Sequence, residues 1–318
     1  MSRYYVFNGD ADGLCALHQL RLVDPAPAEL VTGVKRDIKL LDRVQAGAGD
    51  RVTVLDVSLN SNRLELMRLL DAGASVEYFD HHYAGEIPWH HNFAAHIDVS
   101  AEVCTSILVD RRLQGKYRLW AIVAAFGDNL GQSARILAKT AGLAEPQIEK
   151  LAQLGEYLNY NGYGETVEDL HFHPVELYEE IRPYPDPFIF IAESAAFTRL
   201  AAGFRDDIVM VDSLPPLLED IRYAAYLLPD APWARRVSGV FANRLANDKP
   251  SRAHAVITPS RHGDYSVSVR ASKANPQGAD TLCMKFETGG GRKAAAGINR
   301  LPTESLDRFL TLFAEQFD

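Results

Sequence analysis

The sequence is poor in cysteine and has no long apolar segment, and both absences exclude classes of protein. Its three cysteines, Cys15, Cys104 and Cys283, are widely spaced and form no CxxC pair. This usage argues against a disulfide framework and predicts a protein of the reducing cytoplasm. The best apolar run, residues 119–127, has about half of the ~18 residues that a membrane span needs. The N-terminus has no apolar stretch of signal-peptide length, so we expect no membrane association.

Positive charge is not in excess either, since the formal net charge is −9. This balance argues against a protein that coats long nucleic acid, although a short phosphorylated substrate needs only a local positive cluster. Hydrophobic residues make up 47% and charged residues 24% of the chain, which excludes a disordered or collagen-like protein. The length of 318 residues predicts about two domains at roughly 150 residues each.

Strand-like and helix-like patterns alternate in the first third of the chain. The apolar runs at residues 4–7, 52–57 and 75–79 are typical of buried strands, and helical patterns follow the first two. This alternation predicts a parallel sheet with crossover helices. Ligands of such sheets bind at the carboxyl ends of the strands. Acidic residues follow all three runs, so a site is expected at that edge.

The middle of the chain is predicted to be mostly helical, with helices at residues 103–113, 120–126, 134–140, 146–158 and 188–202. Residues 159–164, with the sequence NYNGYG, are interpreted as a loop in which Tyr160 or Tyr163 could stack on a base or sugar. The prolines at 183, 185 and 187 are interpreted as a rigid connector before the last domain. The helical middle also offers a surface for a homodimer.

The last 90 or so residues have a different pattern. Residues 253–257 and 265–270 alternate like half-buried strands. The run Gly289-Gly290-Gly291 precedes Arg292 and an alanine-rich segment. We expect these glycines to open a helix and to hold an anion through their backbone amides.

Carboxylates and imidazoles gather after the predicted strands. Asp10 and Asp12 are two residues apart, a spacing that also suits a turn or a helix N-cap. Two anionic ligands so close repel each other unless a divalent cation neutralises them. Asp56 ends the second run and Asp80-His81-His82 ends the third, while Asp128 follows an apolar helix. Because aspartate and histidine together suit Mn, Fe or Zn rather than Ca, we predict a metal site.

These residues resemble the motifs of the DHH phosphoesterases, in order and at fitting distances. The family's acidic loop is matched by Asp10-Ala11-Asp12-Gly13, its strand-ending aspartate by Asp56, its name motif by residues 80–82 and its fourth aspartate by Asp128. Residues 266–270 and 286–297 look like the DHH-associated substrate domain. The resemblance implies an α/β protein with a parallel-sheet catalytic domain at residues 1–130, a helical connector at 131–229 and a smaller α/β substrate domain at 230–318.

The resemblance also implies a site with two Mn²⁺ ions. One ion would be held by Asp12, Asp56, His81 and Asp128, and the other by Asp10 and the bridging Asp56. Asp80 would orient the adjacent histidine, and His82 would contact the scissile phosphate or its leaving group. Substrate phosphate would be bound by a further set comprising Asn8, Arg270, Gly289, Gly290, Gly291 and Arg292.

The sequence departs from the family pattern in three positions. Phe7 stands where the phosphatase branches have a histidine ligand, and Asn8 stands where the exonuclease branch has an aspartate. Asn8 offers only a neutral oxygen, so we expect the second ion to be weakly held. Arg292 replaces the usual histidine after the glycines and keeps the ability to bind phosphate.

The implied activity is manganese-dependent hydrolysis of phosphodiester or phosphomonoester bonds. Short oligonucleotides, dinucleotides and 3′-phosphoadenosine-type nucleotides all suit such a site. Two alternatives remain open at this point. A haloacid-dehalogenase-like phosphatase would use Asp10 as nucleophile but would leave Asp80, His81 and His82 without a role. The second alternative is a nucleotide-binding module that has the same fold but no catalytic activity.

Overall fold

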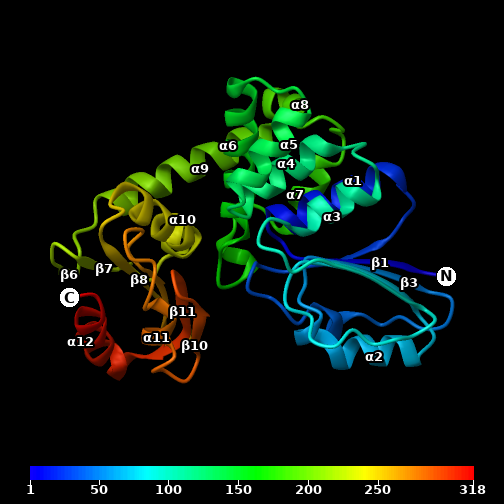
Figure 1. The fold of residues 1–318 in the computed structure, drawn as a ribbon. Coiled ribbons are helices and arrows are strands. Elements are labelled where there is room, and N and C mark those ends of the chain that lie inside the picture. Colours follow the sequence, from blue (N-terminus) through cyan, green and yellow to red (C-terminus); the bar gives the residue numbers. More distant parts are fainter. The chain divides into compact units, whose positions relative to one another are not determined.

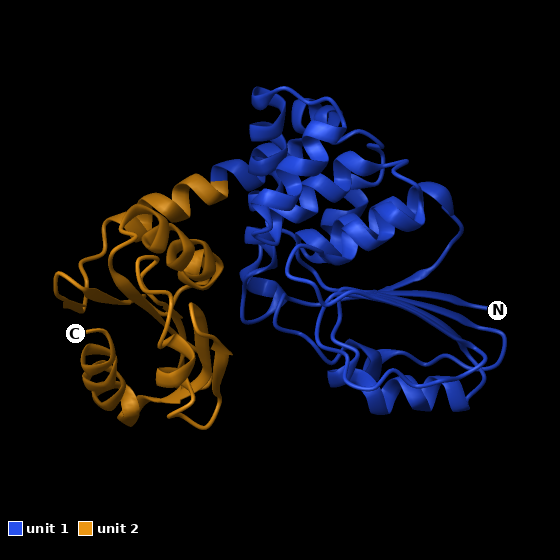
Figure 2. Ribbon diagram, in the orientation of Figure 1, with its two compact units in different colours: residues 1–202 blue, residues 203–318 orange.

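The computed structural model describes all residues from 1 to 318. They divide into two compact units, residues 1–202 and 203–318 (Figure 2), and the chain passes from one to the other within helix α9 (Ala195–Asp212). No helix combines the length and the apolar composition needed to cross a bilayer. The α/β class expected from the sequence is confirmed, while the three-part division with boundaries at 130 and 229 stays a prediction.

A five-stranded parallel sheet organises the first unit, with the strand order β2-β1-β3-β4-β5. The strands are β1 (Arg3–Phe7), β2 (Glu29–Val31), β3 (Arg51–Leu55), β4 (Ser75–Asp80) and β5 (Phe93–Ile97). Side chains alternate between the faces of each strand. Along β1, Tyr5 and Phe7 enter one core, whereas Tyr4 and Val6 enter the other. Both faces are therefore buried, as is typical of parallel sheets.

Helices cover both faces of this sheet (Figure 1). One face is covered by α2 (Arg63–Asp71) and the 3₁₀ turns at Leu40–Arg43 and Asn60–Asn62. The other face carries a larger core built by α1 (Ala11–Val23), α3 (Thr105–Arg112), α4 (Arg118–Gly127), α5 (Gly131–Thr140), α6 (Glu145–Gly162), α7 (Pro174–Ile181) and α8 (Pro187–Glu193), with a 3₁₀ turn at Val167–Asp169. The helices of the middle of the chain thus share one core with the sheet.

Three expectations for the helical region are corrected. Residues 159–162 form the last turn of α6 rather than a loop, and Tyr160 is fully buried, so it cannot stack on a substrate base. The helix expected at 188–202 is broken at Ser194, which has extended backbone angles. The proline-rich segment lies inside the first unit, where the Trp120 indole donates a hydrogen bond to the Pro185 carbonyl (3.0 Å). It therefore does not connect the two units.

A mixed six-stranded sheet organises the second unit, with the order β10-β11-β9-β8-β7-β6. The strands are β6 (Leu218–Glu219), β7 (Tyr223–Leu227), β8 (Ala253–Pro259), β9 (Asp264–Arg270), β10 (Gly289–Arg292) and β11 (Ala295–Pro302). Helix α10 (Pro232–Asp248) connects the parallel pair β7 and β8 and packs on one face. Helices α11 (Ala279–Cys283) and α12 (Leu306–Phe317) cover the other face, α12 following a 3₁₀ turn at Thr303–Ser305.

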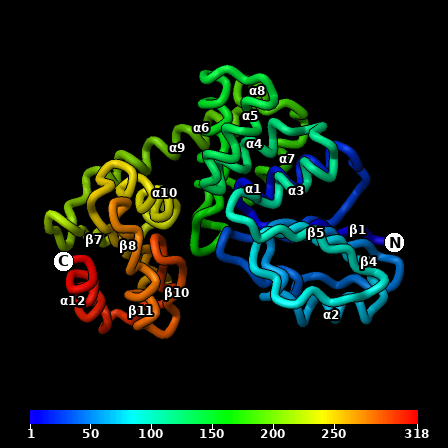
Figure 3. The backbone as a smooth tube through the Cα atoms, viewed as in Figure 1, coloured from blue at the N-terminus to red at the C-terminus, as the bar shows by residue number.

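The glycine run at 289–291 does not open a helix, contrary to expectation. It forms the edge strand β10, which pairs antiparallel with β11 through a two-residue turn (Figure 3). Gly291 has a φ of +139°, and a Cβ there would lie 2.5 Å from the Ala296 Cα. This close approach of two strands explains the glycine. Anion binding at a helix N-terminus is therefore not available to this segment.

Candidate metal centre

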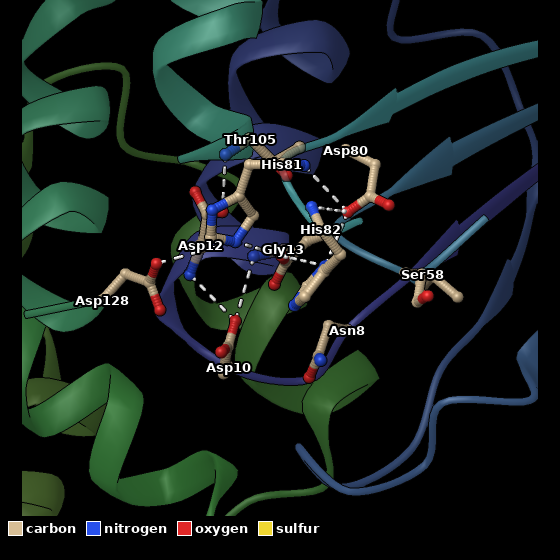
Figure 4. A network of polar contacts seen from close by, with 12 residues as sticks. Asn8, Asp10, Asp12, Gly13, Ser58, Asp80, His81, His82, Thr105 and Asp128 are labelled. Atoms are coloured by element: carbon tan, nitrogen blue, oxygen red, sulfur yellow. Dashed lines mark hydrogen bonds and ion pairs between the residues drawn. The ribbon is translucent and has the colours of Figure 1, made fainter. Parts of the chain in front are cut away.

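The carboxyl ends of three adjacent parallel strands bring the predicted acidic residues to one edge of the sheet. Asp10 follows β1, Asp56 follows β3 and Asp80 ends β4, and these strands are direct neighbours. Asp12 lies in the first turn of α1, and Asp128 follows the last residue of α4. Figure 4 shows Asp10, Asp12, Asp80 and Asp128 around the two histidines. The convergence expected from the strand ends is therefore present.

Ligand atoms converge in two overlapping groups, in each of which they lie within 4.8 Å of one another. One group joins Asp12, His81 and Asp128, and the other joins Asp56, His81 and His82. The His81 Nε2 atom lies 3.4 Å from Asp56 Oδ1 and 3.6 Å from Asp128 Oδ2. The four residues expected to hold the first ion thus all occur in these two groups, which share His81. Asp10 belongs to neither group.

The hydrogen bonding of the His81 ring and a buried Asp56 oxygen without a hydrogen-bond partner both fit a bound cation. The His81 Nδ1 atom lies 3.0 Å from the Val103 carbonyl oxygen. Because a carbonyl only accepts, Nδ1 carries the hydrogen in the neutral ring and Nε2 keeps its lone pair for a metal. Asp56 Oδ1 is buried without a hydrogen-bond partner, which is costly for a carboxylate. A divalent cation that takes nitrogen and oxygen ligands would relieve that cost.

Negative charge is poorly compensated around Asp56 and Asp128. Burial raises the pKa of Asp56 well above its usual value, and the charges of Asp10 and Asp12 add to the effect. Burial also raises the pKa of Asp128. A bound cation favours the ionised carboxylates and so acts against both shifts. The electrostatics of this part of the site are those of a cation site.

Asp12 has a structural task in addition to its place in the cluster. Its Oδ2 accepts a hydrogen bond from the Thr105 amide and its Oδ1 accepts one from the Ser106 amide, both at 2.7 Å. These amides open helix α3, whose own N-cap residue provides no side-chain acceptor. A carboxylate of α1 therefore caps α3 from across the fold. The two bonds also fix the direction in which Asp12 faces His81.

Asp80 orients a different histidine ring from the one expected. Its Oδ1 bonds the His82 Nδ1 atom at 2.6 Å, whereas its only contact with the adjacent His81 is with the backbone amide (2.9 Å). The reason is that the His81 ring turns toward Val103 instead. With Nδ1 bound by Asp80, Nε2 is the ring nitrogen of His82 that is left for a further contact, and the side chain is 45% exposed. Burial lowers the pKa of His82, but the bond to Asp80 outweighs it and the pKa is raised.

The sequence analysis missed Lys35, whose ammonium lies beside Asp10. The Lys35 Nζ donates to Asp10 Oδ2 and to Asn159 Oδ1 (3.0 Å), and it lies 3.7 Å from Asp128 Oδ1. Burial raises the pKa of Asp10, but the charge of Lys35 outweighs it and holds the pKa below its usual value. Lys35 follows β2, which pairs in parallel with β1 and so ends at the same edge. A strand predicted just before Lys35 would have placed the lysine at this edge. However, β2 has only three residues, which give too short a pattern to recognise in the sequence.

Phe7 and Asn8, two of the three positions that depart from the family motif, have other tasks in this structure. Phe7 is fully buried in the apolar core between the sheet and the helices. The Asn8 Nδ2 atom donates to the Lys35 carbonyl oxygen (3.3 Å). Asn8 thus holds the backbone of the lysine, and its Oδ1 is buried without a hydrogen-bond partner.

Arg270 and Arg292, two of the predicted substrate residues of the second unit, share one face of its sheet. Arg270 pairs with Ala295, which pairs with Arg292 across the hairpin, so both arginine side chains leave the same face. Arg292 is exposed, whereas the Arg270 guanidinium donates to the Asn243 side chain of α10 (3.0 Å). Gly290 has open space where a Cβ would lie. Ala295 lies between the two arginines in the sheet.

Comparison with known proteins identifies the fold. No family model matches the chain, and no curated protein matches it in sequence. A manganese-bound RecJ exonuclease structure aligns over 99% of this chain and 91% of its own, with a TM-score of 0.63 and 18% identity. The chain has the RecJ fold. The RecJ structure from Thermus thermophilus in complex with Mn²⁺ gives a TM-score of 0.64 at 18% identity, with 100% of this chain and 52% of that chain covered.

A second kind of enzyme shares the RecJ fold with this chain. The pGpG-specific phosphodiesterase PggH from Vibrio cholerae aligns over 100% of this chain and 99% of its own, with a TM-score of 0.57 and 13% identity. The α/β fold with a parallel sheet that the resemblance implied is therefore confirmed, whereas a substrate-binding role for the second unit stays a prediction.

Proposed function

We propose that this chain is a metal-dependent phosphoesterase that hydrolyses short oligonucleotides or small nucleotides. The observation that carries the proposal is the convergence of Asp12, His81, Asp128 and the unpaired Asp56 Oδ1 at one sheet edge. The proteins that share the fold include an exonuclease bound to manganese and a phosphodiesterase for pGpG. Mn²⁺ suits the aspartate and histidine ligands and, when bound, would activate a water molecule for attack on phosphorus.

The chain's own residues provide the remaining functions. Asp80 fixes the His82 ring through Nδ1, so Nε2 points a hydrogen-bond donor at the scissile phosphate when the ring is protonated. Against the effect of burial, the bond to Asp80 raises the pKa of His82 and so favours that protonated form. His82 can then donate a proton to the leaving oxygen. Asp12, held by the amides of α3, keeps its carboxylate directed at His81 without rearrangement.

The second unit is proposed to bind a substrate phosphate away from the metal. Arg292 is exposed beside a strip of glycine and alanine residues, and a guanidinium can pair with phosphate through two hydrogen bonds. Arg270 lies on the same face and is oriented by Asn243. Gly289, Gly290 and Gly291 would act here by leaving room for a ligand on the strand, since they do not form a helix N-terminus.

The test is a hydrolysis assay on the full chain after treatment with a chelator. Short oligoribonucleotides, pGpG and a 3′-phosphoadenosine nucleotide are supplied with and without Mn²⁺, and released mononucleotide or phosphate is measured. We expect Mn²⁺-dependent release from at least one of these compounds. His82→Gln should lower kcat by about 10²–10⁴-fold, the usual contribution of a positioned acid or base. His91→Gln, an exposed histidine nearby in sequence, is the matched control and should leave kcat unchanged.

Three results would contradict the proposal or a part of it. A chain that binds Mn²⁺ but cleaves none of these compounds would be a binding module without activity. A trapped phosphoaspartyl intermediate on Asp10 would indicate the haloacid-dehalogenase-like mechanism instead. If the His82→Gln variant keeps full activity in Mn²⁺, His82 takes no part in the reaction.

A further inference from the structure

We infer that the Lys35 ammonium takes the place of the second metal ion, so that the site binds one Mn²⁺ rather than two. The inference rests on the proposed function and concerns the position that Asp10 faces. Its basis is the contact of Lys35 Nζ with Asp10 Oδ2, Asn159 Oδ1 and Asp128 Oδ1. These three oxygens come from the end of β1, from α6 and from the end of α4. A single positive group therefore already lies among them.

Lys35 is held firmly in this position by the surrounding backbone. Its amide donates to the Gly162 carbonyl (2.9 Å), and its own carbonyl accepts from Asn8 Nδ2 (3.3 Å). Its Nζ lies 5.6 Å from the centre of the Tyr163 ring, within range of a cation–π contact. The side chain is 24% exposed. Lys35 is thus fixed within the site by its backbone and side-chain contacts, unlike a mobile surface lysine.

Asp10 has little capacity left to bind a metal. Its Oδ1 accepts hydrogen bonds from the Asp12 amide (3.0 Å) and the Gly13 amide (3.1 Å), as the N-cap of α1. Its Oδ2 accepts the Lys35 ammonium. A carboxylate oxygen has about two lone pairs, so Oδ1 is saturated and Oδ2 is shared with a cation already. Asp10 was expected to hold the second ion together with the bridging Asp56.

The departures from the family motif at positions 7 and 8 agree with this assignment. A second ion in the phosphatase and exonuclease branches would need a histidine at position 7 or an aspartate at position 8. Here Phe7 faces the apolar core, and Asn8 supports the Lys35 backbone. The ligands that are missing for an ion and the lysine that replaces it therefore belong to one local arrangement. A permanently charged ammonium would supply positive charge without any requirement for a second metal.

The test measures how many Mn²⁺ ions the chelator-treated full chain binds, by isothermal titration with Mn²⁺ alone and by electron paramagnetic resonance of the loaded protein. We expect one ion per chain and a spectrum of isolated Mn²⁺ without exchange coupling. Lys35→Ala should open the position to a second ion, with two ions bound and a coupled spectrum. The matched control Lys39→Ala removes an exposed lysine from the same segment and should still bind one.

Each outcome has a distinct meaning. Two coupled ions in the wild-type chain would overturn the inference and leave the proposed function intact. A folded Lys35→Ala variant that still binds one ion would also overturn it, because the lysine would then not be what excludes the second ion. A wild-type chain that binds no Mn²⁺ would overturn the proposed function itself. The wild-type spectrum decides the matter even if Lys35→Ala does not fold.

Discussion

Asp56→Asn should stabilise the metal-free protein while removing most of its affinity for Mn²⁺. Asp56 is buried, has an unpaired Oδ1 and lies among the carboxylates of Asp10 and Asp12, which together raise its pKa. Asparagine keeps the shape and removes the charge. It also suits the backbone, because residue 56 has a φ of +57°, a conformation that asparagine tolerates well. Alanine at this position would add strain of about 1–2 kcal/mol.

The magnitude follows from the size of the first unit and from typical gains. Relief of an unfavourable buried interaction at a functional site commonly adds about 0.5–2 kcal/mol. For a unit of 202 residues, each kcal/mol corresponds to roughly 2–4 °C in Tm, so Tm should rise by about 1–8 °C. Mn²⁺ at about 100 times Kd stabilises the wild type by about 2.7 kcal/mol, or roughly 5–11 °C. The variant should lose most of this metal-dependent rise.

The assay is thermal unfolding of both chains in chelator and in excess Mn²⁺, followed by far-ultraviolet circular dichroism. Asp42→Asn removes an exposed carboxylate of the same unit and should stay within about 0.5 kcal/mol of the wild type in both conditions. A Tm of Asp56→Asn below that of the wild type in chelator would refute the reasoning. So would a metal-dependent rise as large as that of the wild type.

Three further predictions concern other parts of the molecule. Asp12→Asn should lower stability in chelator by about 1.5–3 kcal/mol, because one of the amides that open α3 would face an NH₂ group instead of an oxygen; an unchanged Tm would show that α3 does not depend on this cap. Burial lowers the pKa of His18 to about 4, so the unfolded state, with a histidine pKa near its usual value, binds more protons below about pH 6.5. Stability should therefore fall by up to ~3 kcal/mol as the pH falls from about 6.5 to 4. The urea midpoint of a folded His18→Gln variant should change less with pH than that of the wild type. An equal change of the two midpoints with pH would contradict this prediction. Arg292→Ala should lower kcat/KM about tenfold to a few hundredfold with unchanged Mn²⁺ affinity, and either full activity or loss of Mn²⁺ binding would count against a role in holding phosphate.

The parts of the fold that the sequence predicted correctly have strong local patterns. β1, β3 and β4 are apolar runs that end in an acidic residue or are followed by one within three residues, and the helices α1 and α2 follow the first two. These patterns report burial on both faces of a parallel sheet. Because the ends of neighbouring parallel strands meet at one edge, the approximate place of the site followed from the sequence as well.

The features that escaped prediction depend on tertiary contacts. The last turn of α6 contains asparagine and glycine, which favour loops, yet Asn161 holds the backbone of residues 171 and 172 through three hydrogen bonds at 2.9–3.1 Å, and Gly162 lies against Asp10. β10 is a glycine run that becomes a strand only because β11 pairs with it. Such elements are specified by their partners and have little propensity of their own.

The same distinction applies to Asp10 and Asp12, whose spacing suggests one common role. Asp10 caps its own helix and pairs with Lys35, so its charge is already balanced by the protein. Asp12 caps α3 by accepting hydrogen bonds from two backbone amides, which carry only partial charge. It also lies close to His81 and Asp128. One carboxylate is therefore neutralised by a lysine while the other still needs a cation. No spacing rule separates them, because the difference lies in residues 35 and 105, which reach the motif only in the folded chain.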